Sequence, residues 1–161
     1  MSSNADIILR EVEDGDLPTF FEHGRDPEAV RMAAFTAEDP ADRANFDSHW
    51  AIIRSKDSVT LRTILFKGEV AGHVASFERG PDREVTYWIG REHWGKGIAT
   101  EALSMFLQVD GIRPLYARAA KDNTGSTRVL EKCGFRKFGE DSGFAHGRGA
   151  RVEEYILELK G

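Results

Sequence analysis

The sequence predicts a mixed α/β domain organised around one sheet. Three runs of alternating apolar side chains, at 59–66, 70–77 and 84–89, are separated by short turn signals and indicate an antiparallel meander. A helical repeat of apolar residues follows at 97–109, and another strand pattern follows at 114–119. Because a helix joins them, the strands at 84–89 and 114–119 should lie parallel in a right-handed crossover.

The N-terminal part is expected to hold one strand and three helical pieces. Residues 7–12 have a strand pattern. Asp16 is a candidate helix cap, because apolar residues at helical spacing and a proline in the first turn follow it. Asp26 and Asp39, each followed directly by proline, are expected to open two further helices, the first of which runs to about residue 34.

The C-terminal part is expected to add a short helix and a hairpin. Residues 122–132 have the helical pattern, and Gly134 suits the left-handed position that ends a helix. The segments 135–140 and 151–159 have strand patterns and should pair with each other. Between them we expect a long glycine-rich loop, 141–150.

Length and composition indicate a single domain, residues 1–161. Hydrophobic residues make up 40% and charged residues 30%, as in ordinary globular proteins. The sequence has neither a long apolar run nor a signal-peptide pattern, and its one cysteine, Cys133, cannot build a disulfide framework or a zinc site. We therefore expect a cytoplasmic protein with no metal and no membrane contact, and the net charge of −5 argues against nucleic acid as a partner.

A glycine-rich turn at 90–97 joins the central strand to the helix at 97–109. It holds three glycines. The end of a strand, a glycine-rich turn and the start of a helix leave several backbone N–H groups directed at one point, which favours phosphate. The turn therefore predicts an anion site, suited to a cofactor that carries a pyrophosphate.

Two phosphate-binding motifs compete for this turn. The spacing of Gly90, Gly95 and Lys96 matches the start of the P-loop pattern, but Gly97 stands where that pattern needs Ser or Thr for magnesium. A magnesium-dependent nucleotide enzyme is thus one alternative, for which the motif is incomplete.

The other motif has a closer match. Residues 94–102, after the strand that ends in 87–89, closely resemble the acyl-CoA-binding motif of GNAT N-acetyltransferases, in particular the RimJ/RimL-like branch of ribosomal-protein N-terminal acetyltransferases. The resemblance implies the GNAT fold, which coincides with the pattern-based prediction, with acetyl-CoA as the cofactor and CoA as the product. In that family the turn amides hold the pyrophosphate and the preceding strand pairs with the pantetheine arm. The cofactor contacts that it implies are Trp88, Ile89, Trp94, Gly95, Lys96, Gly97, Ile98, Ala99 and Thr100.

One position departs from the family pattern. The family has Gln or Arg two residues before the aromatic position of the turn, where this chain has Glu92, with Arg91 one place earlier. Because backbone amides carry most of the binding, this departure puts little in doubt.

A second motif lies at 117–135. From its residues alone, helix capping and packing explain it. It is also similar to the second cofactor element of the GNAT family, which implies that Asn123 contacts the pantetheine arm and that Ser126 lies near the thioester sulfur. Many relatives carry a tyrosine that protonates the leaving thiolate where this chain has Leu130.

Direct acetyl transfer to an amine needs a neutral amine, a stabilised carbonyl oxygen and a protonated or solvated thiolate. The resemblance implies that a backbone N–H within 88–90 stabilises the oxygen, and Ser126 remains as the candidate acid for the thiolate, directly or through a water. Glu84 is the candidate base, and its alternative role is an exposed turn carboxylate that pairs with Arg83 or Arg79. His73 is a second candidate base, with core packing as its alternative role.

The acceptor is open between a small-molecule amine and a protein N-terminus. In the family, the segment after the first strand forms one wall of the acceptor pocket, so Phe35, Phe46 and Trp50 are substrate-wall candidates, although packing explains each singly. The loop 142–149 either overhangs this pocket or is a hairpin tip. The missing tyrosine favours an α-amine over a lysine side chain, because an α-amine loses its proton more readily.

An interpretation from another class is a catalytically impaired, GNAT-shaped domain that binds acyl-CoA for regulation. Leu130 in the tyrosine position favours it. The resemblance is also compatible with a homodimer, since relatives are often dimers.

Overall fold

The structure is a computed structural model that describes residues 6–161. Within these residues the chain forms one mixed sheet of seven strands, in which only β4 and β5 pair in parallel. Across the sheet, the strands are β1 (Ile7–Arg10), β2 (Thr60–Phe66), β3 (Glu69–Arg79), β4 (Asp82–Ile89), β5 (Leu115–Ala120), β7 (Ala150–Leu159) and β6 (Arg136–Ala145). The predicted meander, parallel crossover and C-terminal hairpin are therefore confirmed.

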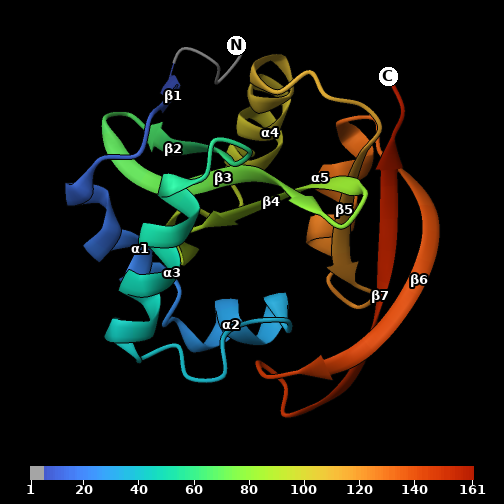
Figure 1. Ribbon diagram of the computed structural model, residues 1–161, viewed down its shortest axis with the longest axis horizontal. Helices are drawn as coiled ribbons and strands as arrows, with labels where there is room; N and C mark the ends of the chain where they lie inside the picture. The colour runs from blue at the N-terminus through green and yellow to red at the C-terminus, as the bar shows by residue number, and fades with distance from the viewer. Residues whose placement is uncertain (1–5) are drawn as a thin grey trace.

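Helices cover both faces of the sheet (Figure 1). In chain order, the helical elements are η2 (Asp14–Asp16), α1 (Leu17–His23), α2 (Pro27–Ala33), α3 (Arg43–Ser55), η3 (Arg91–His93), α4 (Ile98–Val109) and α5 (Thr124–Lys132). The view of Figure 1 has α4 above the strands and α1, α2 and α3 below them. None of the helices within residues 6–161 combines the length and the apolar character needed to cross a bilayer.

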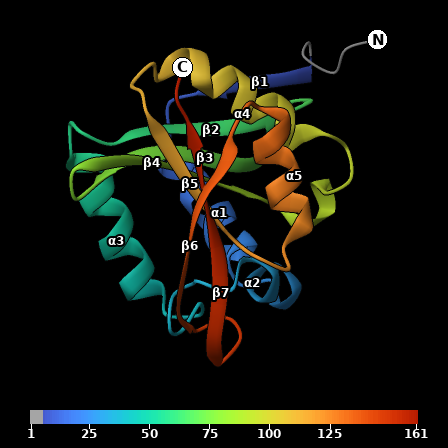
Figure 2. The same cartoon turned by 90° about the vertical axis from the view of Figure 1, so that its right-hand side faces the viewer.

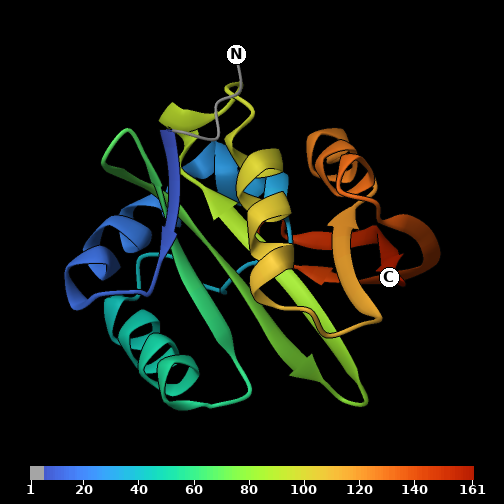
Figure 3. The ribbon, with the colours of Figure 1, turned by 90° about the horizontal axis from the view of Figure 1, so that it is seen from above.

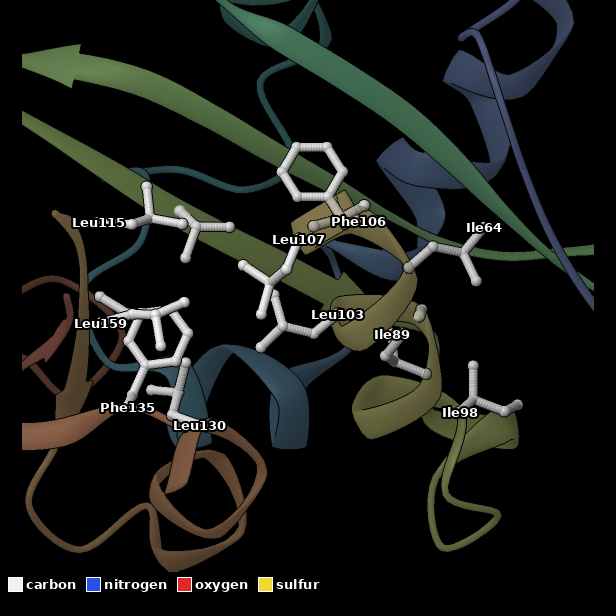
Figure 4. Close-up of a cluster of buried hydrophobic side chains, with 14 of the residues drawn as sticks. Ile64, Ile89, Ile98, Leu103, Phe106, Leu107, Leu115, Leu130, Phe135 and Leu159 are labelled. Carbon is white, nitrogen blue, oxygen red and sulfur yellow. The ribbon is translucent and has the colours of Figure 1, made fainter. Parts of the chain in front are cut away.

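The core lies between the sheet and the α4–α5 layer (Figure 4). The apolar side of α4 fits against β1 to β4, since its residues recur at the helical period and face the strands. Fully buried side chains of this core are Ile64, Val74, Ile98, Leu103, Phe106, Leu115, Leu130, Phe135 and Leu157.

The strands β4 and β5 separate as they run toward their C-terminal ends (Figure 3). Their pairing is registered at one position, Glu84 opposite Tyr116, near the start of both strands. Beyond it, the edge of β4 that faces β5 has no strand partner within residues 6–161. This divergence opens the sheet on the side where the glycine-rich turn follows β4.

Three local predictions need correction. Asp16 holds the N-cap position of α1 but makes no capping hydrogen bond there, because the chain enters α1 through η2 and Asp16 already has helical dihedral angles. The third helix begins at Arg43 with Asp42 as its cap, while Asp39 closes a preceding turn by accepting from the Ala41 amide at 3.0 Å.

The third correction concerns the C-terminal hairpin. Most of the expected loop 141–150 is strand, since β6 continues to Ala145 and β7 begins at Ala150. Every residue from Glu140 to Ala145 pairs with a residue of β7, so strand pairing outweighs the low strand propensity of the glycines and polar residues in this stretch.

Candidate active site

The turn between β4 and α4 directs free amides at one point. Gly95 and Gly97 have φ angles of 78° and 75°, a left-handed conformation that glycine adopts without strain. The first helical hydrogen bond of α4 is from the Glu101 amide to the Gly97 carbonyl. Within the described chain, the amides of residues 95–100 donate to no backbone or side-chain acceptor outside the helix. Such amides at a helix N-terminus, together with the helix dipole, suit an anion, and the anion site at this turn stays a prediction.

Lys96 and Trp94 belong to this turn, and Lys67 comes from the β2–β3 turn. The ammonium groups of Lys67 and Lys96 lie 5.3 and 5.6 Å from the centre of the Phe66 ring, so both lysines lie beside the same ring. Trp94 is 40% exposed, and its indole N–H donates to the Ile89 carbonyl at 2.9 Å. Trp94 thereby ties the turn to the end of β4.

The open edge of β4 presents the backbone of two residues. The Gly90 amide donates to the Ala71 carbonyl of β3 at 2.8 Å. Backbone groups alternate in direction along a strand, so Trp88 also faces β3, while Tyr87 and Ile89 face the space beside β5. Of the three amides expected near the carbonyl oxygen, only that of Ile89 thus faces this space. Ile98 has its side chain in the core, so only its amide can reach a ligand.

Ser126 lies in the first turn of α5 and meets a tyrosine from β4. The Tyr87 hydroxyl donates to Ser126 Oγ at 3.1 Å. The Ser126 amide donates to Oδ1 of the cap Asn123 at 3.2 Å, and Asn123 Nδ2 donates to the Met32 carbonyl of α2 at 3.2 Å. Asn123 therefore joins α5 to α2, and Leu130 points into the core.

Sequence analysis missed the Tyr87–Ser126 contact. Burial outweighs the hydrogen bond and raises the pKa of Tyr87, which keeps the phenol protonated. Alternation along β4 places Tyr87 on the same face as Val85 and Ile89, which is the α4–α5 face. That signal was in the sequence, but the identity of the partner was not.

The tip of the β6–β7 hairpin closes against α2 (Figure 2). The Gly147 amide donates to the Ala34 carbonyl at 2.8 Å. Arg148 binds both carboxylate oxygens of Asp122 at 2.8 Å, and its Nε donates to the Arg31 carbonyl. Ala34 has φ 66° and ψ −58°, a strained γ-turn geometry in a fully buried residue. The tip thus fixes the segment that carries Phe35.

The expected acceptor wall divides into an exposed and a buried part. Phe35 is 38% exposed and stays a candidate contact. Trp50 is 4% exposed and packs among Phe20, Phe46 and His73, which fits the packing alternative, and a direct contact with substrate stays a prediction. Thr86 of the central strand β4 is exposed, so α1, α2 and α3 leave that part of the sheet uncovered.

The two candidate bases lie in very different surroundings. Burial lowers the pKa of His73 to about 3, and its Nδ1 has no partner within residues 6–161. Glu84 is buried, and its carboxylate accepts from Arg118 at 2.9 Å. Arg118 also lies 3.2 Å from Glu154, whose pKa burial raises. Glu84 is therefore a paired carboxylate at the closed end of the β4–β5 opening.

Comparison with known proteins gives a family match. The sequence profile of the family described as "Acetyltransferase (GNAT) domain" matches residues 6–136. A curated relative, "Uncharacterized N-acetyltransferase p20" from Bacillus licheniformis, is 29% identical over 80 residues, which are 47% of this chain and 45% of the relative. The match thus spans a little under half the length of that relative.

Solved structures share the architecture over almost the whole chain. Mycobacterium smegmatis RimJ in complex with CoA-disulfide has a TM-score of 0.80 at 22% identity, over 96% of this chain and 82% of that chain. RimL, a ribosomal alpha-N-protein acetyltransferase in complex with coenzyme A, has a TM-score of 0.77 at 16% identity, over 98% of this chain and 97% of that chain. At these identities the likeness shows a common fold.

Proposed function

Since this chain belongs to the acetyltransferase (GNAT) domain family, we propose that it is an N-acetyltransferase that moves the acetyl group of acetyl-CoA directly to a primary amine and releases CoA. The observation that carries the proposal is the set of unpaired amides at residues 95–100, directly beside the open edge of β4. The amides suit a pyrophosphate, and the open edge of β4 suits an extended chain with amide groups.

The residues present fit acetyl-CoA. The amides of 95–100, with Lys96 at the same turn, would hold the pyrophosphate. The backbone of Tyr87 would pair with the pantetheine amides as an additional strand does, and the Ile89 amide would face the thioester. Bound acetyl-CoA supplies an activated acetyl group as a thioester, and Ser126 and Asn123 would lie along its arm.

The chain's own groups answer two of the three chemical demands. The Ile89 amide is the donor for the carbonyl oxygen as negative charge builds on it. The Ser126 hydroxyl is the donor for the departing sulfur. For the amine, neither candidate base is well suited, because His73 with a pKa of about 3 binds protons too weakly and Glu84 is already paired with Arg118.

The acceptor must therefore arrive largely neutral. Near neutral pH an α-amine is neutral about 300 times more often than a lysine side chain, given ordinary pKa values near 7.8 and 10.4. We accordingly propose a protein N-terminal α-amine or a small-molecule amine of low pKa as the acceptor. The relatives RimJ and RimL share the fold and support this class.

The test is acetylation of paired peptides, followed by mass spectrometry. One peptide has a free N-terminus and no lysine, and the other has a blocked N-terminus and one internal lysine; small amines of graded pKa form a third set. We expect acetylation of the free N-terminus or of low-pKa amines, dependent on acetyl-CoA. Efficient modification of the internal lysine alone would overturn the proposed acceptor class.

The impaired-domain alternative rests on Leu130, which replaces the tyrosine of many relatives. Thermal unfolding with acetyl-CoA distinguishes a folded domain that binds the cofactor without turnover from an inactive preparation. Acetyl-CoA at a hundred times its Kd should stabilise the fold by about 2.7 kcal/mol. Stabilisation by acetyl-CoA without turnover of any amine would favour the regulatory role, and stabilisation by magnesium-ATP alone would contradict the cofactor.

A further inference from the structure

The side chains of Tyr87 and Ser126 meet through their hydroxyl groups. Tyr87 reaches from β4 across to the first turn of α5, and its Oη donates to Ser126 Oγ at 3.1 Å. Within residues 6–161, the Ser126 hydroxyl proton has no acceptor of its own. A serine oxygen that accepts one hydrogen bond has its proton left to donate elsewhere.

The titratable group that acts on Tyr87 is Cys133, which directly follows α5, and burial raises the pKa of both side chains. Cys133 donates to the Thr100 carbonyl of α4 at 3.5 Å, and Glu101 of α4 is the charged group that acts on Cys133. Within the described residues, no cation is hydrogen-bonded to the Tyr87 or Ser126 hydroxyl.

Relative acidities decide what Tyr87 can do. A phenol whose pKa lies above 10 is a weaker acid than a thiol with a pKa near 8.5. Full transfer of the tyrosine proton to a thiolate is therefore disfavoured by more than about 30-fold. Tyr87 is thus suited to orient and strengthen a hydrogen bond, and unsuited to act as the acid itself.

We infer that Tyr87 is a positioning residue: its hydrogen bond to Ser126 Oγ orients the serine hydroxyl so that the serine proton points at the leaving sulfur. The inference rests on the proposed acetyl transfer. In that step the amine nitrogen forms a bond to the acetyl carbon, the carbon–sulfur bond breaks, and its electron pair goes to sulfur. The Ser126 O–H donates to this thiolate, and the proton lost by the nitrogen reaches the sulfur through water to give the CoA thiol. Tyr87 and Ser126 end the step in the forms in which they began it.

Binding of CoA against pH gives a readout that does not depend on turnover. If the pair stabilises the thiolate, the pKa of the bound CoA thiol falls below its free value, and affinity rises with pH up to that free value. Each pKa unit of lowering raises the affinity about tenfold between neutral and alkaline pH. Desulfo-CoA, which has no thiol, should show no such rise. Calorimetry with both ligands at several pH values measures the difference.

The variants are Tyr87→Phe, Ser126→Ala and their combination. We expect each single change to remove most of the pH-dependent gain for CoA while leaving desulfo-CoA affinity unchanged. Tyr87→Phe should lower kcat about tenfold without changing KM for acetyl-CoA, and the double variant should be no slower than Ser126→Ala. The matched control is Tyr116→Phe, because the Tyr116 hydroxyl bonds to Glu158 at 2.8 Å, away from α5.

The outcomes separate the two proposals. Wild-type kcat and a wild-type pH gain in Tyr87→Phe would overturn the role of Tyr87 while acetyl transfer stands. Equal losses for CoA and desulfo-CoA would show a purely structural role and overturn it too. A wild-type protein that binds neither ligand would overturn the proposed function and the inference with it. Should Tyr87→Phe fail to fold, 3-fluorotyrosine in a Tyr116→Phe and Tyr155→Phe background changes only the donor strength of Tyr87, and an unchanged pH gain there would refute its role.

Discussion

Replacement of Asp16 by asparagine should remove a large part of the acid sensitivity of the fold. Asp16 accepts from Arg10 at 2.7 and 2.8 Å, from Thr63 Oγ1 at 2.6 Å and from the Glu13 amide at 2.9 Å. Burial alone would raise the pKa of Asp16, but these donors outweigh burial and lower it from 3.8 to about 2. The carboxylate thereby joins β1, η2 and β2 at the entry to α1.

The sign follows from the lowered pKa. A carboxyl group whose pKa is lower in the folded state contributes stability above its unfolded pKa, and that stability is lost as the pH falls through the folded value. A change from 3.8 to about 2 corresponds to about 2.4 kcal/mol of unfolding free energy. The advantage of wild type over Asp16→Asn should therefore shrink by about 2 kcal/mol between about pH 5 and pH 2, where the folded carboxyl is half protonated.

Urea unfolding followed by tryptophan fluorescence, repeated across this pH range, measures the difference. Asp14→Asn is the matched control, because Asp14 is in the same turn but its side chain is 95% exposed in its pair with Arg54. Its stability curve should run parallel to that of wild type. If the curves of wild type and Asp16→Asn were also parallel from pH 5 to pH 2, the role assigned to Asp16 would be refuted.

Three further changes test the turn, the hairpin tip and the core. Gly97→Ala and its control Gly68→Ala both place a side chain at positive φ, so each should cost about 1 kcal/mol in urea unfolding. Only Gly97→Ala should lower the affinity for CoA in calorimetry. Equal affinities of the two variants would contradict the turn as the anion site. Arg148→Lys loses the two-pronged contact with the Asp122 carboxylate, so the KM for the acceptor should rise while desulfo-CoA affinity stays constant, and hydrogen exchange at 143–149 should accelerate. Unchanged exchange would contradict the role of the hairpin tip. Asp110→Ala removes the carboxylate that pairs with the buried Arg83 at 2.8 Å, so it should cost about 3–5 kcal/mol in urea unfolding, whereas a loss below 1 kcal/mol would mean that water replaces the carboxylate.

The parts of the site that depend on neighbouring residues in the sequence could be predicted from it. The turn 90–97 lies between a strand and a helix whose periodicities are both visible, so its amides and their common direction follow from local rules. The cap Asn123 and the stop at Gly134 follow in the same way, and Gly134 has the expected positive φ of 98°.

The parts that depend on distant contacts could not be predicted. Alternation gave the face of Tyr87 but not its partner, because Ser126 is 39 residues away and reaches it only through the packing of α5 on the sheet. The ion pair of Glu84 with Arg79, at 3.5 Å, was one of the alternatives expected from the sequence, but the closer partner Arg118 comes from a strand whose register no local pattern fixes. The cofactor roles of the turn and of Asn123 remain predictions that binding experiments must test.

The hydrogen bonds that fix the segment 31–34, at the end of α2, have a consequence for how this protein can change over evolutionary time. Arg148, Asn123 and the Gly147 amide all donate to main-chain carbonyls of the segment 31–34. A carbonyl is present whatever side chain a residue carries, so these hydrogen bonds set no side-chain requirement at residues 31–33, whereas Ala34 is fully buried. Exposed side chains next to the proposed acceptor can therefore change while the backbone that presents them keeps its place. The acceptor preference can thereby change through substitutions in this segment, without changes in the elements proposed to bind the cofactor.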